Sequence, residues 1–349
     1  MRKGLFLSCF ALLASYLQAE KIVQCVTNFP IDAEMYTHAL KERGYDGRVV
    51  VVNIKDYDND LLMRKGRFHE ILRALHLDYP WKAQVSDDVD KIVFFNVNPN
   101  VVKKYDLSRF PKEKMVLFMW EPFTVLPTMY LPKVQNCFSK IYTWDDALVD
   151  GRTYFKFYYP VFVPRLESIP SFEEKKLCTL VCSNLKSSNR AELYSQRIEA
   201  IRYFERVGEE GFEFYGRKWD PAQYKSYKGQ IEDKLGTIKN YRFAICYENT
   251  ADVCGYVTEK IFDCFAAGVV PVYWGASNIG DFVPGDCFVD RRDFASMEEL
   301  HQFMRSMSKE TYEGYLVHIR AFLQSDGVKK FTFDHLADAF YQAVSQGSL

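Results

Sequence analysis

Short apolar runs alternate with segments of helical periodicity along most of the chain. Continuous apolar runs, typical of buried parallel strands, occur at residues 49–54, 115–120, 177–183 and 243–247. Between such runs, apolar residues recur every three or four positions, as in amphipathic helices. The clearest of these segments are residues 33–43, 61–77, 193–204 and 257–266. The alternation predicts an α/β protein with parallel sheets.

The most complete unit is residues 241–275, which read as strand, polar turn, helix and second strand. A helix that begins directly after a buried strand presents free N–H groups and the positive end of its dipole. Lys260 lies in the first turns of this helix, and Glu259 beside it can accept hydrogen bonds from sugar hydroxyls. The pattern indicates a nucleotide or nucleotide-sugar site, although a structural unit with a solvated Glu-Lys pair would look the same.

Two residues in or near the second strand of this unit restrict where the helix ends and how the strand pairs. Gly268 suits the position just after the end of a helix. Pro271 falls inside the expected strand 269–274, where proline is unusual because it lacks a backbone N–H.

A glutamate follows the apolar run 115–120. Pro122 pushes the preceding residue toward extended geometry, so Glu121 should lie at the carboxyl end of the strand. Ligands of open α/β sheets bind at that edge. A carboxylate beside Trp120 can have a raised pKa and act as a general base. A salt-bridged or helix-capping glutamate is the alternative.

Arg190 lies at the start of the helix expected at 193–204. A cation is electrostatically unfavourable at a helix N-terminus, and a bound anion would explain it. An exposed arginine without a role is the other interpretation.

The middle and the beginning of the chain suggest its organisation. Residues 155–170 contain three closely spaced prolines and mark a candidate domain boundary. Arg2 and Lys3 precede an apolar run at 4–17, so residues 1–19 resemble a signal peptide or an uncleaved signal-anchor. The run is shorter than the roughly 20 apolar residues that a spanning helix needs.

Composition narrows the function classes. The net charge of −1 gives no basic field of the kind that binds nucleic acid. The nine cysteines include one close pair, Cys178 and Cys182, without histidines nearby, so no metal site is predicted. A hydrophobic content of 48% over 349 residues suffices for two folded domains.

Several motifs together resemble glycosyltransferase family 10, the α1,3/α1,4-fucosyltransferases. Within 241–275 they are YRF at 241–243, YEN at 247–249, YVTEK at 256–260 and GVVPV at 268–272. Outside it, they are FMWEP at 118–122, IYTWDD at 141–146 and SNLKSSNRAELY at 183–194. Arg242 stands where the family usually has lysine, which keeps the charge. The match is poor before residue 115.

The resemblance implies an α/β protein of the GT-B class, with two Rossmann-like domains facing a cleft. Residues 20–165 would form the N-terminal acceptor domain, and residues 171–325 the domain that binds GDP-fucose. Residues 326–349 would form a C-terminal helix that packs back on the N-terminal domain.

The resemblance also assigns roles to six residues. It makes Glu121 the general base, Arg190 and Lys260 the ligands of the diphosphate, and Glu259 the acceptor of ribose hydrogen bonds. Asn249 and Tyr256 would contact the donor. It implies no obligatory metal, and leaves stimulation by a divalent metal open.

The expected reaction is an inverting transfer of L-fucose from GDP-β-L-fucose to a glycan hydroxyl, with O3 of N-acetylglucosamine as the favoured position. The alternatives are transfer from another GDP-sugar, or a non-catalytic glycan-binding relative. The expected location is the secretory pathway or a Golgi-type membrane anchor, with the cytoplasmic face of a bacterial membrane as the alternative. The acceptor glycan and the linkage stay open.

Overall fold

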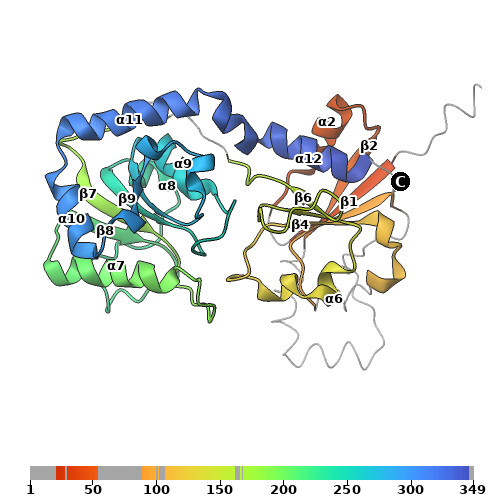
Figure 1. Ribbon diagram of the computed structural model, residues 1–349, viewed down its shortest axis with the longest axis horizontal. Helices are drawn as coiled ribbons and strands as arrows, with labels where there is room; N and C mark the ends of the chain where they lie inside the picture. The colour runs from red at the N-terminus through yellow and green to blue at the C-terminus, as the bar shows by residue number, and fades with distance from the viewer. Residues whose placement is uncertain are drawn as a thin grey trace, which may run out of the picture. The chain divides into compact units, whose positions relative to one another are not determined.

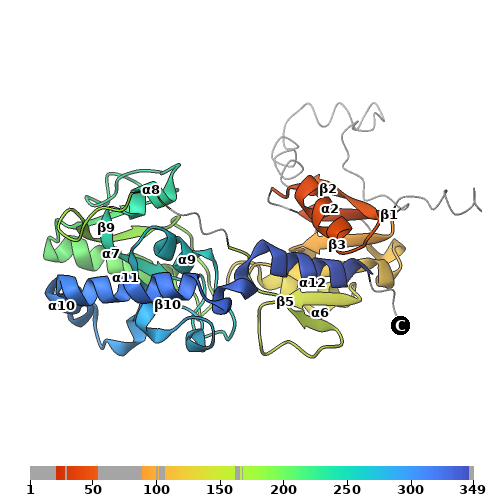
Figure 2. The same cartoon turned by 90° about the horizontal axis from the view of Figure 1, so that it is seen from above.

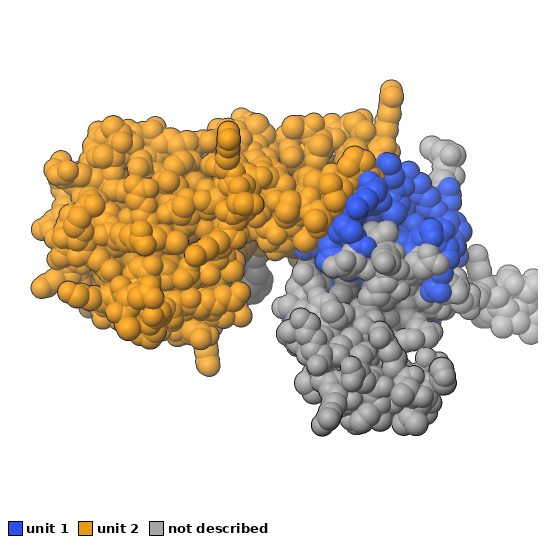
Figure 3. Space-filling model, turned by 90° about the horizontal axis from the view of Figure 1, so that it is seen from below, with its two compact units in different colours: residues 1–118, 133–140, 340–349 blue, residues 119–132, 141–339 orange. Residues whose placement is uncertain are grey.

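The structure is a computed structural model that describes residues 21–27, 30–53, 89–99, 101, 107–161, 166 and 168–345. The expected helix at 61–77 and the segment 1–19 lie outside the described residues. The chain forms two compact units (Figure 3): unit 1 comprises residues 1–118, 133–140 and 340–349, and unit 2 comprises 119–132 and 141–339. The domain limits given above stay a prediction.

Unit 1 contains parallel strands in the order β2-β1-β3-β4. The strands are β1 (Lys21–Thr27), β2 (Gly47–Asn53), β3 (Lys91–Phe95) and β4 (Met115–Met119). Helix α2 (Ala33–Glu42) connects β1 to β2 and is capped by Asp32, whose side chain accepts hydrogen bonds from the backbone N–H groups of Glu34 and Met35. Every residue of β4 is buried, as its apolar sequence predicts.

The last helix of the chain, α12 (Phe333–Ser345), contributes an aromatic residue to unit 1. The ring of Phe340 lies 4.9 Å from Tyr36, 6.3 Å from Phe95 and 6.2 Å from Phe118, measured between ring centroids. Residues more than 200 positions apart in sequence therefore share one aromatic cluster.

Unit 2 contains a five-stranded parallel sheet of order β11-β10-β9-β7-β8 (Figure 1). Its strands are β7 (Lys176–Val181), β8 (Phe212–Tyr215), β9 (Tyr241–Tyr247), β10 (Val270–Trp274) and β11 (Val289–Asp290). Its helices include α7 (Tyr194–Val207), α8 (Lys234–Ile238), α9 (Glu259–Ala266), α10 (Met297–Ser306) and α11 (Lys309–Leu323). A further parallel pair joins β5 (Lys140–Thr143) to β6 (Tyr154–Lys156).

Short helical turns complete the described part of the chain. They are α6 (Pro132–Gln135), η1 (Leu107–Arg109), η2 (Lys112–Lys114), η3 (Pro127–Tyr130), η4 (Ile279–Asp281), η5 (Gly285–Cys287), η6 (Arg291–Asp293) and η7 (Asp326–Phe331).

Helices cover both faces of the five-stranded sheet (Figure 1 and Figure 2). Phe243, Ile245 and Tyr247 of β9 face the core that includes α7 and α10. Ala244 and Cys246 point the other way, into the core that includes α9 and α11. Because both faces are buried, the strand is apolar at every position from Phe243 to Tyr247 rather than alternating.

The structure explains both residues that stood out after the predicted helix, Gly268 and Pro271. Gly268 has a φ of 62°, the left-handed geometry expected just after a helix. Pro271 lies within β10, opposite Ala244 of β9. On the other side, β11 pairs only with Val272 and Tyr273. The proline therefore sits beside the end of the β11 ladder, where the loss of one N–H is tolerated.

Candidate functional site

Helix α9 begins at the carboxyl end of β9. Thr258 caps the helix: its backbone is extended, with φ −113°, and its hydroxyl accepts a hydrogen bond from the backbone N–H of Lys260. Glu259 and Lys260 are the first two helical residues. The predicted helix start therefore places both side chains at the edge of the sheet where ligands bind.

Lys260 is paired with a glutamate to which sequence reasoning assigned no role. Glu248 directly follows β9 and is 0% exposed. Its Oε2 atom lies 2.8 Å from Nζ of Lys260, and its Oε1 atom accepts the backbone N–H of Thr258 at 2.9 Å. The Lys260 side chain keeps 23% of its surface exposed.

The pKa values of Lys260 and Glu259 are both shifted toward the charged form of the side chain. Burial alone would lower the pKa of Lys260, but the negative charges of Glu248 and Glu259 raise it above its usual range. Burial alone would raise the pKa of Glu259, but Lys260 and Lys234 lower it below its usual range. The start of α9 thus carries a fixed cation beside a fixed carboxylate.

Glu121 belongs to the same electrostatic cluster. Its carbonyl accepts a 3.1 Å hydrogen bond from the Tyr130 hydroxyl. The pKa of its side chain is raised, mainly by burial and further by the charges of Glu259 and Glu248, while Lys260 acts in the opposite direction. A carboxylate with a raised pKa is a stronger proton acceptor than an ordinary glutamate.

Asn249 is held by an arginine that sequence reasoning missed. Nη2 of Arg197, on α7, lies 3.0 Å from Oδ1 of Asn249. The carbonyl of Asn249 accepts a hydrogen bond from the hydroxyl of Thr124 at 3.3 Å. One signal in the sequence could have revealed Arg197: it lies on the apolar face of α7, with Ile201 and Phe204.

The expectation about Arg190 was partly wrong. Helix α7 begins at Tyr194, so Arg190 lies in the preceding turn rather than at the helix start, and its side chain is exposed. The argument from the helix dipole therefore does not apply to it. The next residue, Ala191, accepts a 2.7 Å backbone hydrogen bond from Ala251. This contact places the turn beside the residues that follow β9.

Tyr256 lies beneath the cluster rather than on its surface. It is 2% exposed, and its ring centroid lies 4.4 Å from that of Trp144. Burial raises the pKa of its hydroxyl, and the charges of Glu248 and Glu121 act in the same direction. The structure thus brings Glu121, Asn249, Tyr256 and the start of α9 into one region of unit 2.

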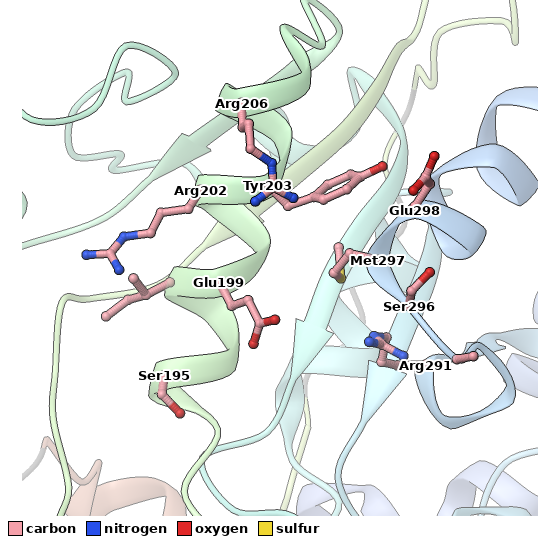
Figure 4. Close-up of a pocket in the computed structure, with 11 residues that line it drawn as sticks. Ser195, Glu199, Arg202, Tyr203, Arg206, Arg291, Ser296, Met297 and Glu298 are labelled. Carbon is pink, nitrogen blue, oxygen red and sulfur yellow. The ribbon is translucent and has the colours of Figure 1, made fainter.

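A separate hollow of about 770 Å³ lies between α7 and the segment 291–298 (Figure 4). Arg202 and Arg206 line it on the α7 side, and Arg291, Ser296 and Glu298 line the opposite wall. None of the six predicted site residues lines this hollow.

In the part of the chain that the structure describes, no three His, Cys, Asp or Glu side chains gather closely enough to hold a metal ion. None of the helices in that part combines the length and apolar character of a membrane span. The metal and localisation expectations stay predictions.

Known proteins resemble parts of the sequence. An α-(1,4)-fucosyltransferase of Arabidopsis thaliana is 42% identical over 73 residues, which are 21% of this chain and 18% of that protein. An α-(1,3)-fucosyltransferase of Helicobacter pylori is 36% identical over 76 residues, 22% of this chain and 16% of that protein. The matched segments thus span less than a fifth of either relative.

Solved structures resemble nearly the whole fold. A crystal structure of an α1,3-fucosyltransferase matches 95% of this chain and 92% of its own, with a TM-score of 0.59 and 14% identity. A structure of α1,3-fucosyltransferase with GDP matches 95% and 93%, with a TM-score of 0.56 and 14% identity. This likeness, together with the parallel strands of unit 1 and of unit 2, confirms the predicted GT-B class with Rossmann-like domains.

The family match covers the five-stranded sheet and its helices. Residues 171–330 match the family model described as glycosyltransferase family 10 (fucosyltransferase), C-terminal part. This range contains five of the six predicted site residues, from Arg190 to Lys260. The chain therefore resembles glycosyltransferase family 10 over residues 171–330, which are 160 of its 349 residues.

Proposed function

We propose that the protein is an inverting fucosyltransferase that moves L-fucose from GDP-β-L-fucose to a hydroxyl of a glycan, with O3 of N-acetylglucosamine as the acceptor atom. The observation that carries this proposal is the cluster formed by Glu121 and the start of α9. A carboxylate of raised pKa lies there within electrostatic reach of a fixed cation, inside a unit that resembles the family 10 domain.

The donor occupies the start of α9 in this proposal. Lys260 and the exposed Arg190 bind the diphosphate, which the N-terminal end of the helix also attracts. The ionised Glu259 accepts hydrogen bonds from the ribose hydroxyls. Asn249 and Tyr256 contact the donor. Because Oδ1 of Asn249 already accepts from Arg197, the amide presents its N–H groups to a donor oxygen.

The chemistry follows from this division of charges. The acceptor oxygen forms a bond to the anomeric carbon of fucose while the bond from that carbon to the phosphate oxygen breaks. The acceptor proton goes to Glu121, and the bonding electrons leave with GDP. The transition state resembles that of glycoside hydrolysis, with positive charge on the sugar ring. Fixed cations at the diphosphate stabilise the leaving group as its negative charge grows.

The acceptor class rests on the names of relatives. A mouse relative, 28% identical over 148 residues, is named a 4-galactosyl-N-acetylglucosaminide 3-α-L-fucosyltransferase; those residues are 42% of this chain and 36% of that protein. Its name supports a galactosylated N-acetylglucosamine as the acceptor. The choice between O3 and O4 is part of the test.

The test is an assay of the purified full chain with GDP-fucose and either N-acetyllactosamine or lacto-N-biose. N-Acetyllactosamine has O3 of its N-acetylglucosamine free, and lacto-N-biose has O4 free. Product mass and linkage analysis identify the transfer. Transfer from another GDP-sugar but not from GDP-fucose would show that the assigned donor is wrong. Binding of glycans without turnover of any donor would contradict the proposal that the protein is an enzyme.

A further inference from the structure

The reaction outlined above gives no role to Glu248, although it is the most deeply buried charge beside the proposed donor site. Its side chain is 0% exposed and follows the last residue of β9. A buried carboxylate is costly unless each oxygen receives hydrogen bonds. The hydrogen-bond donors around the Glu248 carboxylate therefore indicate its role.

Both oxygens of Glu248 face hydrogen-bond donors. Oε1 accepts from the backbone N–H of Thr258 at 2.9 Å, and the Thr258 hydroxyl lies 2.9 Å from each oxygen. Oε2 accepts from Nζ of Lys260 at 2.8 Å. An ionised carboxylate accepts at both oxygens, whereas a glutamine amide would point its own N–H groups at either the Thr258 N–H or the ammonium group.

The arrangement leaves Lys260 with one N–H group for a ligand. An ammonium group has three N–H donors. One points to Glu248, and a second to the Thr258 hydroxyl at 3.0 Å. Among the described residues, the third has no partner. A lysine side chain loses much rotamer freedom when it is fixed, and here the fold has already fixed it before a ligand arrives.

We propose that Glu248 is a positioning residue that holds the ammonium group of Lys260 in place for the diphosphate. This inference rests on the proposed function, because it takes the diphosphate of GDP as the ligand of Lys260. The other role open to Glu248 is to fasten the start of α9 to β9 without positioning the ammonium group of Lys260.

The two roles predict opposite changes in GDP affinity. A buried negative charge near a diphosphate repels it, so removal of that charge should tighten GDP binding if Glu248 only fastens the helix. If Glu248 positions Lys260, its loss lets the ammonium group move and GDP binding weakens. The sign of the change therefore separates the roles.

The experiment is a double-mutant cycle on the full chain, with GDP as the probe and calorimetry as the readout. The variants are Glu248→Gln, Lys260→Met and the double variant. Glu213→Gln is the matched control. Glu213 forms an ion pair with Lys176 near the amino ends of β7 and β8, whereas Glu248 follows the carboxyl end of β9. We expect Glu248→Gln to raise the Kd for GDP about tenfold in the wild-type background. In the Lys260→Met background it should have little effect, and Glu213→Gln should leave the Kd unchanged.

Three results would count against the inference or its basis. Unchanged or tighter GDP binding by Glu248→Gln would overturn it, as would an equal loss in both backgrounds. If the wild-type chain does not bind GDP, the proposed donor falls and the inference falls with it. Should Glu248→Gln fail to fold by circular dichroism, Glu248→Asp replaces it in the cycle. The aspartate keeps the charge one methylene further away, and the same loss coupled to Lys260 is expected.

Discussion

Nη2 of Arg197 donates a 3.0 Å hydrogen bond to Oδ1 of Asn249, across 52 positions of sequence. The same atom also donates to the carbonyls of Tyr247 and Glu248, each at 2.7 Å. Arg197 is 5% exposed. One buried guanidinium group thus binds the backbone carbonyls at the carboxyl end of β9 and orients the Asn249 amide, which we propose contacts the donor.

Replacement of Arg197 should reduce both stability and GDP binding. In Arg197→Met, two buried carbonyls and the partly buried Oδ1 of Asn249 lose their donor, so we expect the free energy of unfolding to fall by about 3 kcal/mol. Urea denaturation measures this loss. Arg190→Met is the matched control, since Arg190 is exposed: it should weaken GDP binding and change stability by less than about 0.5 kcal/mol. Equal stability losses in the two variants would contradict the positions assigned here.

Replacement of Glu121 should abolish transfer while GDP still binds. Glu121→Gln keeps the shape of the side chain but cannot accept the acceptor proton, and loss of a general base lowers kcat by about 10²–10⁴-fold. Steady-state assays with GDP-fucose give kcat, and calorimetry gives the Kd for GDP. Wild-type turnover by this variant would show that another group is the base.

The pH profile of kcat/KM should report the same carboxylate. Glu121 accepts a proton only when ionised, so activity should fall as the pH decreases through its pKa. Since burial raises that pKa, the acidic limb should lie above 4.5, the ordinary value for a glutamate. Assays across pH in buffers of constant ionic strength locate the limb. A limb at or below 4.5 would mean that Glu121 is not the titrating base.

The stability of Glu121→Gln should depend on pH with a defined sign. A carboxyl group whose pKa is raised by folding contributes stability below its unfolded pKa, and this contribution is lost as the pH rises through the folded value. At pH 7 the ionised Glu121 therefore lowers the free energy of unfolding. Glu121→Gln should then have a higher Tm than the wild-type protein. The difference should shrink toward pH 4, below the ordinary value of 4.5. A lower Tm for the variant at pH 7 would contradict the raised pKa.

Removal of divalent metals should leave transfer in place. Lys260 and Arg190 supply positive charge at the diphosphate in the proposed mechanism, so the leaving group does not need a metal ion. Assays in EDTA, and after addition of Mg²⁺ or Mn²⁺, test this expectation. Stimulation by a metal of a few-fold is compatible with it, whereas complete loss of turnover in EDTA would show an obligatory metal.

Local sequence signals sufficed for the elements that carry the site. Pro122 indicated that Glu121 lies near the end of β4, and the structure has it two residues after Met119, the last residue of that strand. Gly268 marked the end of α9, because glycine readily adopts the left-handed backbone geometry found there. The apolar runs predicted strands that are buried on both faces. The same local reasoning misplaced Arg190, since helix starts are set by capping contacts and α7 begins four residues later.

The sequence by itself thus determined the α/β alternation, the GT-B class through its motifs, and the positions of Glu259 and Lys260 at a helix start. Only the tertiary structure decided which charges meet. Glu248 reaches Lys260 because a strand end and a helix start converge, and Arg197 reaches Asn249 because α7 packs over β9. Such pairs depend on how sheet and helices pack together, which no short stretch of sequence encodes.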